Sequence, residues 1–290
     1  MTTWNSIDKA THARKRRAMN HPFSDMALFS SEPFIHSNID RWIELLKEDI
    51  GEKQWPFSLH MARWADRLVF DTLGDLCFGE SFGMKEHDSE LRHIPAIIMD
   101  FTSTIHPIAY SPFTSLWDWL KPRGLDYLLA ARAQIEDEVQ ARCKSGTESR
   151  MGFFHYLFLD LDLDISESES LIIAGSETSP ISLAAAFFYL TRYPHAQEKL
   201  AKEFEAAFSS VDGIKGGGAL HYSQYLRAFI QETMRMSPPV PADLAPDGQQ
   251  GGIVVDGRYI PEGMKVSTVS YCMHHKPDMY PEPFDFRPER

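Results

Sequence analysis

The chain has 290 residues, of which 43% are hydrophobic and 12% aromatic, so it can bury a substantial core and is not wholly disordered. Its formal net charge of −12 excludes a general nucleic-acid binder, which needs a cationic surface to neutralise phosphates. Three widely spaced cysteines, Cys77, Cys143 and Cys272, indicate neither a disulfide framework nor a zinc site and favour a reducing compartment.

The N-terminal region is charged rather than apolar. Residues 1–17 lack the apolar run of a secretory signal. No run of 18 apolar residues occurs anywhere in the chain, so no transmembrane segment is predicted. The basic cluster Arg14 to Arg17 could serve as a localisation tag or a phosphate contact, but a solvated helix face is the simpler interpretation.

The first half of the chain has mainly helical patterning. Residues 34–47 and 62–78 carry apolar side chains at helical spacing, and Gly79 can end the second helix in a left-handed conformation. Residues 100–124 are rich in proline and aromatic residues, which predicts a compact cap rather than a linker. Residues 125–143 return to a helical pattern.

Two consecutive helices are predicted in the centre of the chain. Ser166 stands three residues before Glu169, a capping box that opens a helix running to about Arg192. Pro194 then begins the next helix at its first turn. The glycine-rich residues 213–218 are expected to form a loop, and they lack a phosphate-binding pattern.

The last part of the chain changes character. Residues 226–234 follow an amphipathic helical stripe, which ends before Pro238. Residues 253–260 predict a hairpin with an Asp-Gly turn, and residues 265–271 alternate as a strand. The predicted fold class is therefore mainly α with a small β region, with residues 1–236 mostly helical and 237–290 built from strands and turns.

One segment of the central helix could support proton transfer. Small residues from Ala174 to Ser176 would let a flat group lie against the helix, with Glu177 and Thr178 beside it. Such an acid and hydroxyl can relay protons and position water. The alternative is an ordinary helix with small residues for close packing. Pro180 is expected to distort this helix, since it has no backbone N–H to donate.

A second segment carries a charged pair. Glu232 and Arg235 are three apart on the predicted helix and lie on the flank of its apolar stripe. Such pairs are common on exposed helices and weakly stabilising. A second arginine, such as Arg290, could complete a network with Glu232.

The order and spacing of these segments resemble those of the cytochrome P450 heme-thiolate monooxygenases. In that family a long central helix, a Glu-x-x-Arg helix and a Pro-Glu-Arg segment follow one another at similar intervals. Further segments are similar to those of fungal members: residues 12–17, 21–24, 70–83, 259–263 and 274–277.

The resemblance implies roles for individual residues. Glu177 and Thr178 would be the catalytic pair for oxygen activation, and Ala174 and Gly175 would lie against the cofactor. His12 and Arg16 would contact the heme propionates. Glu232, Arg235 and Arg290 would form a structural triad near the heme-binding loop.

The resemblance also implies an activity. The family uses heme b and dioxygen to hydroxylate or epoxidise a small apolar substrate, here a secondary metabolite, with electrons from an NADPH-dependent flavoprotein reductase. Location in the cytosol or on the cytosolic face of the endoplasmic reticulum follows from the same likeness. No nucleic-acid partner and no membrane anchor are expected within this chain.

Departures from the family pattern lead to a further expectation. We expect residues 1–290 to form a single incomplete domain, truncated at both ends, that runs from about helix C through the Pro-Glu-Arg segment. The cysteine loop and last helix would be absent, so we predict no metal ligand and an inactive chain. The alternatives are a heme-free binding or scaffold protein, and a fragment of a longer active enzyme.

Smaller departures point the same way. The run from Ser166 to Ala174 is shorter than usual, and Asp243 and Asp247 stand where many members have a basic residue. None of the three cysteines can replace the axial ligand, since all precede the Pro-Glu-Arg segment. Cys272, His274 and His275 resemble a metal cluster only superficially, because alternation along a strand would point them apart.

Overall fold

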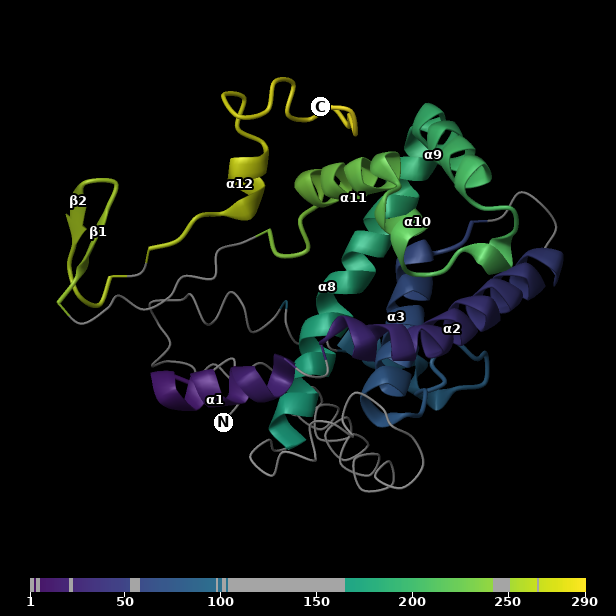
Figure 1. Ribbon diagram of the computed structural model, residues 1–290, viewed down its shortest axis with the longest axis horizontal. Helices are drawn as coiled ribbons and strands as arrows, with labels where there is room; N and C mark the ends of the chain where they lie inside the picture. Colours follow the sequence, from purple (N-terminus) through teal and green to yellow (C-terminus); the bar gives the residue numbers. More distant parts are fainter. Residues whose placement is uncertain are drawn as a thin grey trace. The chain divides into compact units, whose positions relative to one another are not determined.

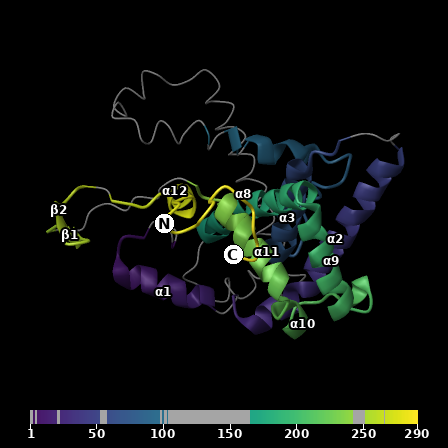
Figure 2. The same ribbon diagram turned by 90° about the horizontal axis from the view of Figure 1, so that it is seen from above.

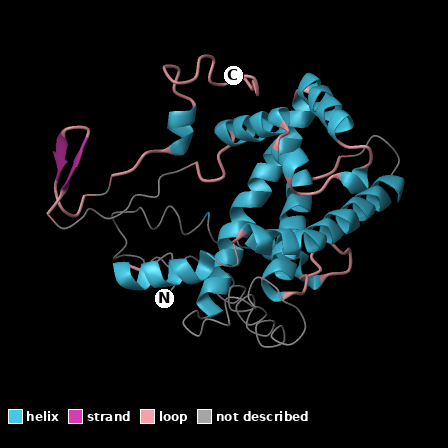
Figure 3. Cartoon of the chain, in the orientation of Figure 1, coloured by secondary structure: helices cyan, strands magenta, loops and turns pink. Residues whose placement is uncertain are grey.

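The computed structural model of the chain describes residues 3, 6–20, 23–52, 58–97, 99, 100, 103, 165–241, 251–264 and 266–290. Helices dominate these residues, and their only strands form one two-stranded sheet (Figure 3). The expected fold class, mainly α with a small β region, is confirmed. The chain divides into two compact units, Met1–Pro180 and Ile181–Arg290.

The elements of each unit follow in chain order (Figure 1). The first unit contains α1 (Lys9–Asn20), α2 (Asp25–Glu52), α3 (Met61–Phe78) and the short 3-10 helix η1 (Glu90–His93). Helix α8 (Ile165–Arg192) begins in the first unit and ends in the second. The second unit contains α9 (Pro194–Ala207), η3 (Val211–Gly213), α10 (Gly218–His221), α11 (Gln224–Met236), β1 (Ile253–Val255), β2 (Arg258–Ile260) and α12 (Ser270–His274).

Helices α2 and α3 lie side by side and form the core of the first unit (Figures 1 and 2). Leu45 and Ala65 have no exposed surface. The indole N–H of Trp42 donates to the backbone carbonyl of Trp64 over 3.0 Å, so the polar atom of this buried ring is satisfied. Both helices lie where the periodicity predicts them.

A buried polar cluster fixes the chain after α3. Gly79 ends α3 with φ of 73°, the left-handed conformation that the sequence predicts. The buried carboxylate of Asp71 then accepts hydrogen bonds from the backbone N–H groups of Met84 and Lys85, at 2.8 and 3.0 Å. Its charge is balanced by Lys85 Nζ at 3.2 Å, as a buried carboxylate requires.

Helix α8 runs without interruption through Pro180, whose side chain is fully buried. It begins at Ile165, next to the predicted capping box, although the side-chain contacts of Ser166 and Glu169 lie outside the described set. Pro194 is the first residue of α9, as predicted, where a missing backbone N–H costs nothing.

The core of the second unit is largely aromatic. Its buried members come from four segments of the chain: Tyr189, Ala196, Tyr225, Phe229 and Phe286. The rings of Tyr189 and Phe286 are stacked with centroids 4.4 Å apart and planes inclined by 6°. Phe286 therefore anchors the irregular C-terminal segment against α8.

The predicted hairpin is present. Ile253 pairs with Ile260 and Val255 with Arg258, and the turn residues Asp256 and Gly257 have φ of 48° and 73°. Two consecutive positive φ angles match the right-handed twist of the flanking strands, which explains the Asp-Gly sequence.

The strand predicted over residues 265–271 is wrong. Residues 266–269 have no regular structure, and α12 occupies Ser270–His274, so Cys272 lies on a helix. The reason is an aromatic contact: the rings of Tyr271 and His275 stack with centroids 4.1 Å apart. Residues four apart can meet in this way only at helical spacing.

Several sequence predictions fall on residues outside the described set. These are almost all of the predicted cap over residues 100–124, the helix over residues 125–143, Cys143, Asp243 and Asp247. Among the described helices, none is both long enough and apolar enough to cross a membrane. In the same part of the chain no three His, Cys, Asp or Glu side chains are placed to hold a metal ion.

Candidate functional site

Helix α11 presents a buried ion pair. Glu232 and Arg235 are one turn apart, and their side chains are only 4% and 6% exposed. Arg235 Nε donates to Glu232 Oε2 at 2.7 Å and Arg235 Nη2 donates to Glu232 Oε1 at 2.9 Å. This two-point contact uses the planar guanidinium in the geometry that lysine cannot supply.

The burial of this pair corrects the sequence interpretation of α11. Phe229 and Thr233 of the predicted apolar stripe are buried, but Ile230 and Met234 of the same stripe are exposed. Glu232 and Arg235, expected on the flank of the stripe, are buried instead. The pair can be buried because its charges cancel and its donors and acceptors are bonded. A hydrophobicity pattern alone cannot detect this.

Residues from the C-terminal segment complete the cluster around Glu232. Arg290 Nε donates to Glu232 Oε1 at 3.0 Å, and the backbone N–H of Arg287 donates to the same oxygen at 2.9 Å. The structure thus brings Arg235 and Arg290 onto the carboxylate of Glu232. The Arg287 contact is made by the backbone and has no signature in the sequence.

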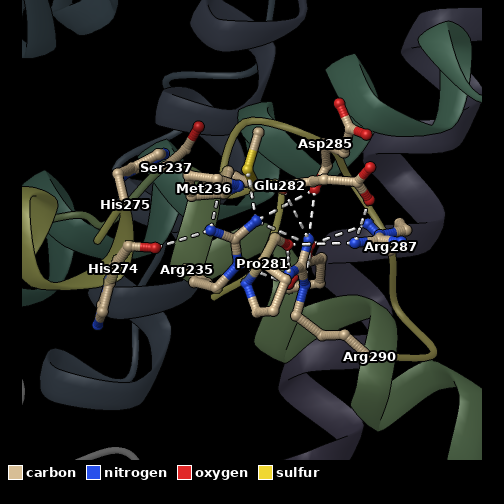
Figure 4. Close-up of polar contacts among 12 residues, drawn as sticks. Arg235, Met236, Ser237, His274, His275, Pro281, Glu282, Asp285, Arg287 and Arg290 are labelled. Carbon is tan, nitrogen blue, oxygen red and sulfur yellow. Dashed lines mark hydrogen bonds and ion pairs between the residues drawn. The ribbon is translucent and has the colours of Figure 1, made fainter. Parts of the chain in front are cut away.

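Most of the other contacts of the two arginines are to backbone carbonyl oxygens, those of His274 and of residues 281–285 (Figure 4). Arg235 Nη1 donates to the Pro283 carbonyl at 2.8 Å, and Arg290 Nη1 donates to the Pro281 carbonyl at 3.0 Å. Both guanidinium groups reach the carbonyl of Asp285, at 3.2 and 2.7 Å. This proline-rich segment forms no helix or sheet, so its carbonyls need donors from elsewhere.

The environment keeps Glu232 ionised. Burial by itself would raise the pKa of this carboxyl group. The hydrogen bonds from Arg235 and from the Arg287 N–H, together with the positive charges of Arg235 and Arg290, outweigh burial and hold the pKa below its ordinary value. The cluster is therefore a charged brace that fixes residues 281–290 on α11.

Helix α8 carries the second group of candidate residues. Ala174 is exposed, Gly175, Glu177 and Thr178 are half-buried, and all four lie within about one helical turn. Thr178 Oγ1 donates to the carbonyl oxygen of Ala174 at 2.9 Å, which fixes the direction of the hydroxyl. Ala174 therefore offers an open, small-residue surface next to an acid and an oriented hydroxyl.

The last candidates lie on α1. His12 and Arg16 are four residues apart and both exposed, so they share one face of the helix. The basic cluster is solvated at Arg14, Arg16 and Arg17, but Lys15 is buried.

The comparisons with a family model and with curated proteins indicate the same family. The model of one protein family, described as cytochrome P450, matches residues 5–290. Among curated proteins, the cytochrome P450 monooxygenase poxM of Penicillium oxalicum is 32% identical over 98% of the chain, which spans 58% of the relative. The cytochrome P450 monooxygenase atnE of Emericella nidulans is 30% identical over 99% of the chain and 60% of the relative.

A shorter relative is covered more fully. A cytochrome P450 monooxygenase of Gibberella zeae is 30% identical over 98% of the chain, which spans 69% of that protein. The chain thus spans about three fifths of the length of the first two relatives.

Proposed function

Because the chain belongs to the cytochrome P450 family, we propose that it is part of an enzyme for heme- and dioxygen-dependent oxidation, by hydroxylation or epoxidation, of a small apolar secondary metabolite. The observation that carries this proposal is the buried Glu232–Arg235 pair, with Arg290 bonded to Glu232. A pair whose burial costs the desolvation of two charges is hard to explain as a surface feature. It is well explained as a brace that holds residues 281–290 in a fixed conformation.

The α8 residues support a place for the cofactor. The family implies heme, a flat group with two carboxylate arms. The exposed surface at Ala174 leaves room for a flat ring, and the exposed cations of α1 can pair with carboxylates. The described residues therefore fit the group in these two respects. Heme, when bound, supplies the oxidising chemistry with dioxygen.

The chain's own residues would then handle protons and orientation. We propose that Glu177 exchanges protons with solvent and that Thr178 positions water, its hydroxyl being oriented by the Ala174 carbonyl. His12 and Arg16 would hold the carboxylate edge of the ring. The electrons would come from an NADPH-dependent flavoprotein reductase, the kind of redox partner that the family generally uses.

The spectrum of the reduced, CO-bound protein tests this proposal. The longest transcript product of the gene should be expressed beside the 290-residue chain, each supplied with heme. We expect a thiolate-type Soret band from the longer product if it adds a cysteine loop. We expect none from the 290-residue chain, because Cys77, Cys143 and Cys272 all precede the Pro-Glu-Arg segment.

Two results would count against parts of this proposal. A thiolate-type band from the 290-residue chain would show that one of its own cysteines binds the iron. Failure of both products to bind heme would favour a non-catalytic binding or scaffold protein. Turnover with NADPH and the reductase should be measured only on a product that shows the band.

A further inference from the structure

Gly175 of α8 lies in close contact with α3. A Cβ atom built on Gly175 would lie 3.0 Å from Cδ1 and 3.3 Å from Cδ2 of Leu73. Contacts this short are rare for real Cβ atoms, so the Leu73 side chain occupies space that any other residue at position 175 would need. The two helices approach each other at this point because position 175 has no side chain.

Helix α3 is held firmly at the same level. A Cβ on the neighbouring Gly74 would lie 2.8 Å from the Phe82 ring and 2.9 Å from the Glu80 carbonyl oxygen. Asp71, one turn earlier, is bonded to the backbone of Met84 and Lys85. Leu73 is therefore presented from a part of α3 that has little room to shift away from α8.

Adjacent residues of α8 lie in opposite surroundings. Ile172, Ser176 and Pro180, spaced four apart, are buried and form the inner face of this part of the helix. Ala174 is exposed. The small residues at positions 174 and 175 are thus explained differently. Ala174 lies on an open surface, whereas Gly175 lies at a contact between two helices.

We propose that Leu73 is a positioning residue for the Ala174–Thr178 turn, and that Gly175 is required by this contact rather than by approach of the cofactor. Leu73 packs against Gly175, where no side chain is present. It so fixes the position of the Ala174–Thr178 turn along the helix axis and its rotation about that axis, and with them the position of the Thr178 hydroxyl. The consequence for oxidation rests on the proposed function, whereas the packing relation does not.

A double-variant cycle on the 290-residue chain without cofactor tests the packing relation. We expect G175A to lower the thermal midpoint by about 2 to 8 °C, because the added methyl group overpacks the contact. L73A alone should also lower it, by leaving a cavity. In L73A/G175A the new methyl group has room, so the midpoint should lie at or above that of L73A.

G51A is the matched control. Gly51 is a helical glycine of α2 with no atom within 4 Å of its would-be Cβ. Alanine should leave the midpoint unchanged or raise it slightly, since glycine is the poorer helix former. If L73A/G175A falls below L73A by as much as G175A falls below the unmodified chain, the two sites are independent and the inference is overturned.

The same variants in the heme-loaded longer product separate this inference from the proposed function. We expect G175A to reduce heme retention or product formed per NADPH, and L73A/G175A to recover part of that loss. An equal loss with and without L73A would assign Gly175 to the cofactor and overturn the inference. An unmodified protein that oxidises nothing would defeat the proposed function, yet the unfolding cycle would still decide the packing relation.

Discussion

At the scale of single residues, the hydrogen bonds that Glu232 accepts explain why an acidic residue stands at position 232. Its carboxylate accepts hydrogen bonds from two guanidinium groups and from one backbone N–H. Arg235 in turn reaches carbonyls of His274, Pro283 and Asp285. Only arginine has enough donors in a fixed plane to do this, so lysine could not replace it.

The first prediction concerns Glu232. E232Q leaves the buried charge of Arg235 without its counterion, so we expect the free energy of unfolding to fall by about 3 to 5 kcal/mol at neutral pH. Urea denaturation followed by circular dichroism would measure this. E289Q is the control: Glu289 makes an exposed pair with Lys199 at 2.7 Å, which should contribute no more than about 1 kcal/mol.

The pH dependence gives a second, independent test of the same residue. The pKa of Glu232 in the folded chain lies below its ordinary value of 4.5. Its ionised form therefore contributes stability above that value, and the contribution is lost as the pH falls from there through the folded pKa. E232Q should lose less stability than the unmodified chain over this acid range, and parallel pH profiles would argue against the brace.

At the scale of elements, α11 is shaped by its neighbours as much as by its own sequence. Its N-terminal cap does not come from Ser223, which makes no capping hydrogen bond with its side chain. Glu203 of α9 supplies it instead: its two carboxylate oxygens accept the N–H groups of Tyr225 and Leu226 at 2.8 and 2.9 Å. A carboxylate at a helix N-terminus also interacts favourably with the helix dipole.

The prediction at this scale is that E203A destabilises the second unit. Losing a cap and a favourable charge should cost about 1 to 2 kcal/mol. Chemical denaturation monitored by circular dichroism would measure the loss. Glu205 lies on the same helix and is exposed, so E205A should change the free energy of unfolding by less than about 0.5 kcal/mol. Equal effects of the two variants would contradict the capping role.

Element boundaries show where local pattern fails. Gly79, Pro194 and the Asp256-Gly257 turn were predictable because glycine and proline act through their own backbone. The strand over residues 265–271 was not, because alternation of apolar residues also fits a short helix tied by one aromatic pair. A five-residue helix has too few positions to show a period.

At the scale of the whole molecule, each unit has its own buried interior. In the second unit, residues far apart in sequence meet around Phe286. Its ring stacks on that of Tyr189, and its centroid lies 5.5 Å from the centroid of the Phe229 ring. The Glu232 cluster and this aromatic core together hold the C-terminal segment. Polar contacts fix its backbone, and Phe286 supplies the apolar burial.

The corresponding prediction concerns Phe286. F286A should cost about 3 to 5 kcal/mol, because it removes a buried ring and leaves a cavity among aromatic neighbours. Phe284, two residues earlier, is 66% exposed, and F284A should cost well under half as much. Differential scanning calorimetry of the two variants would compare them, and similar midpoints would show that Phe286 is not an anchor.

The sequence by itself determined the family, the helical class, the places of α2, α3, α8, α9 and α11, and the order and spacing of Glu232, Arg235 and Arg290. These follow from periodicity, from the backbone properties of glycine and proline, and from the order and spacing of motifs. All are properties of residues or of intervals along the chain.

Only the tertiary structure decided how these residues act together. It buried Glu232 and Arg235, joined them to backbone groups of residues 281–287, and placed Leu73 against Gly175. Such contacts join residues that are distant in sequence, and several involve backbone atoms that every residue carries. Their identity depends on how the helices pack, which no local pattern records.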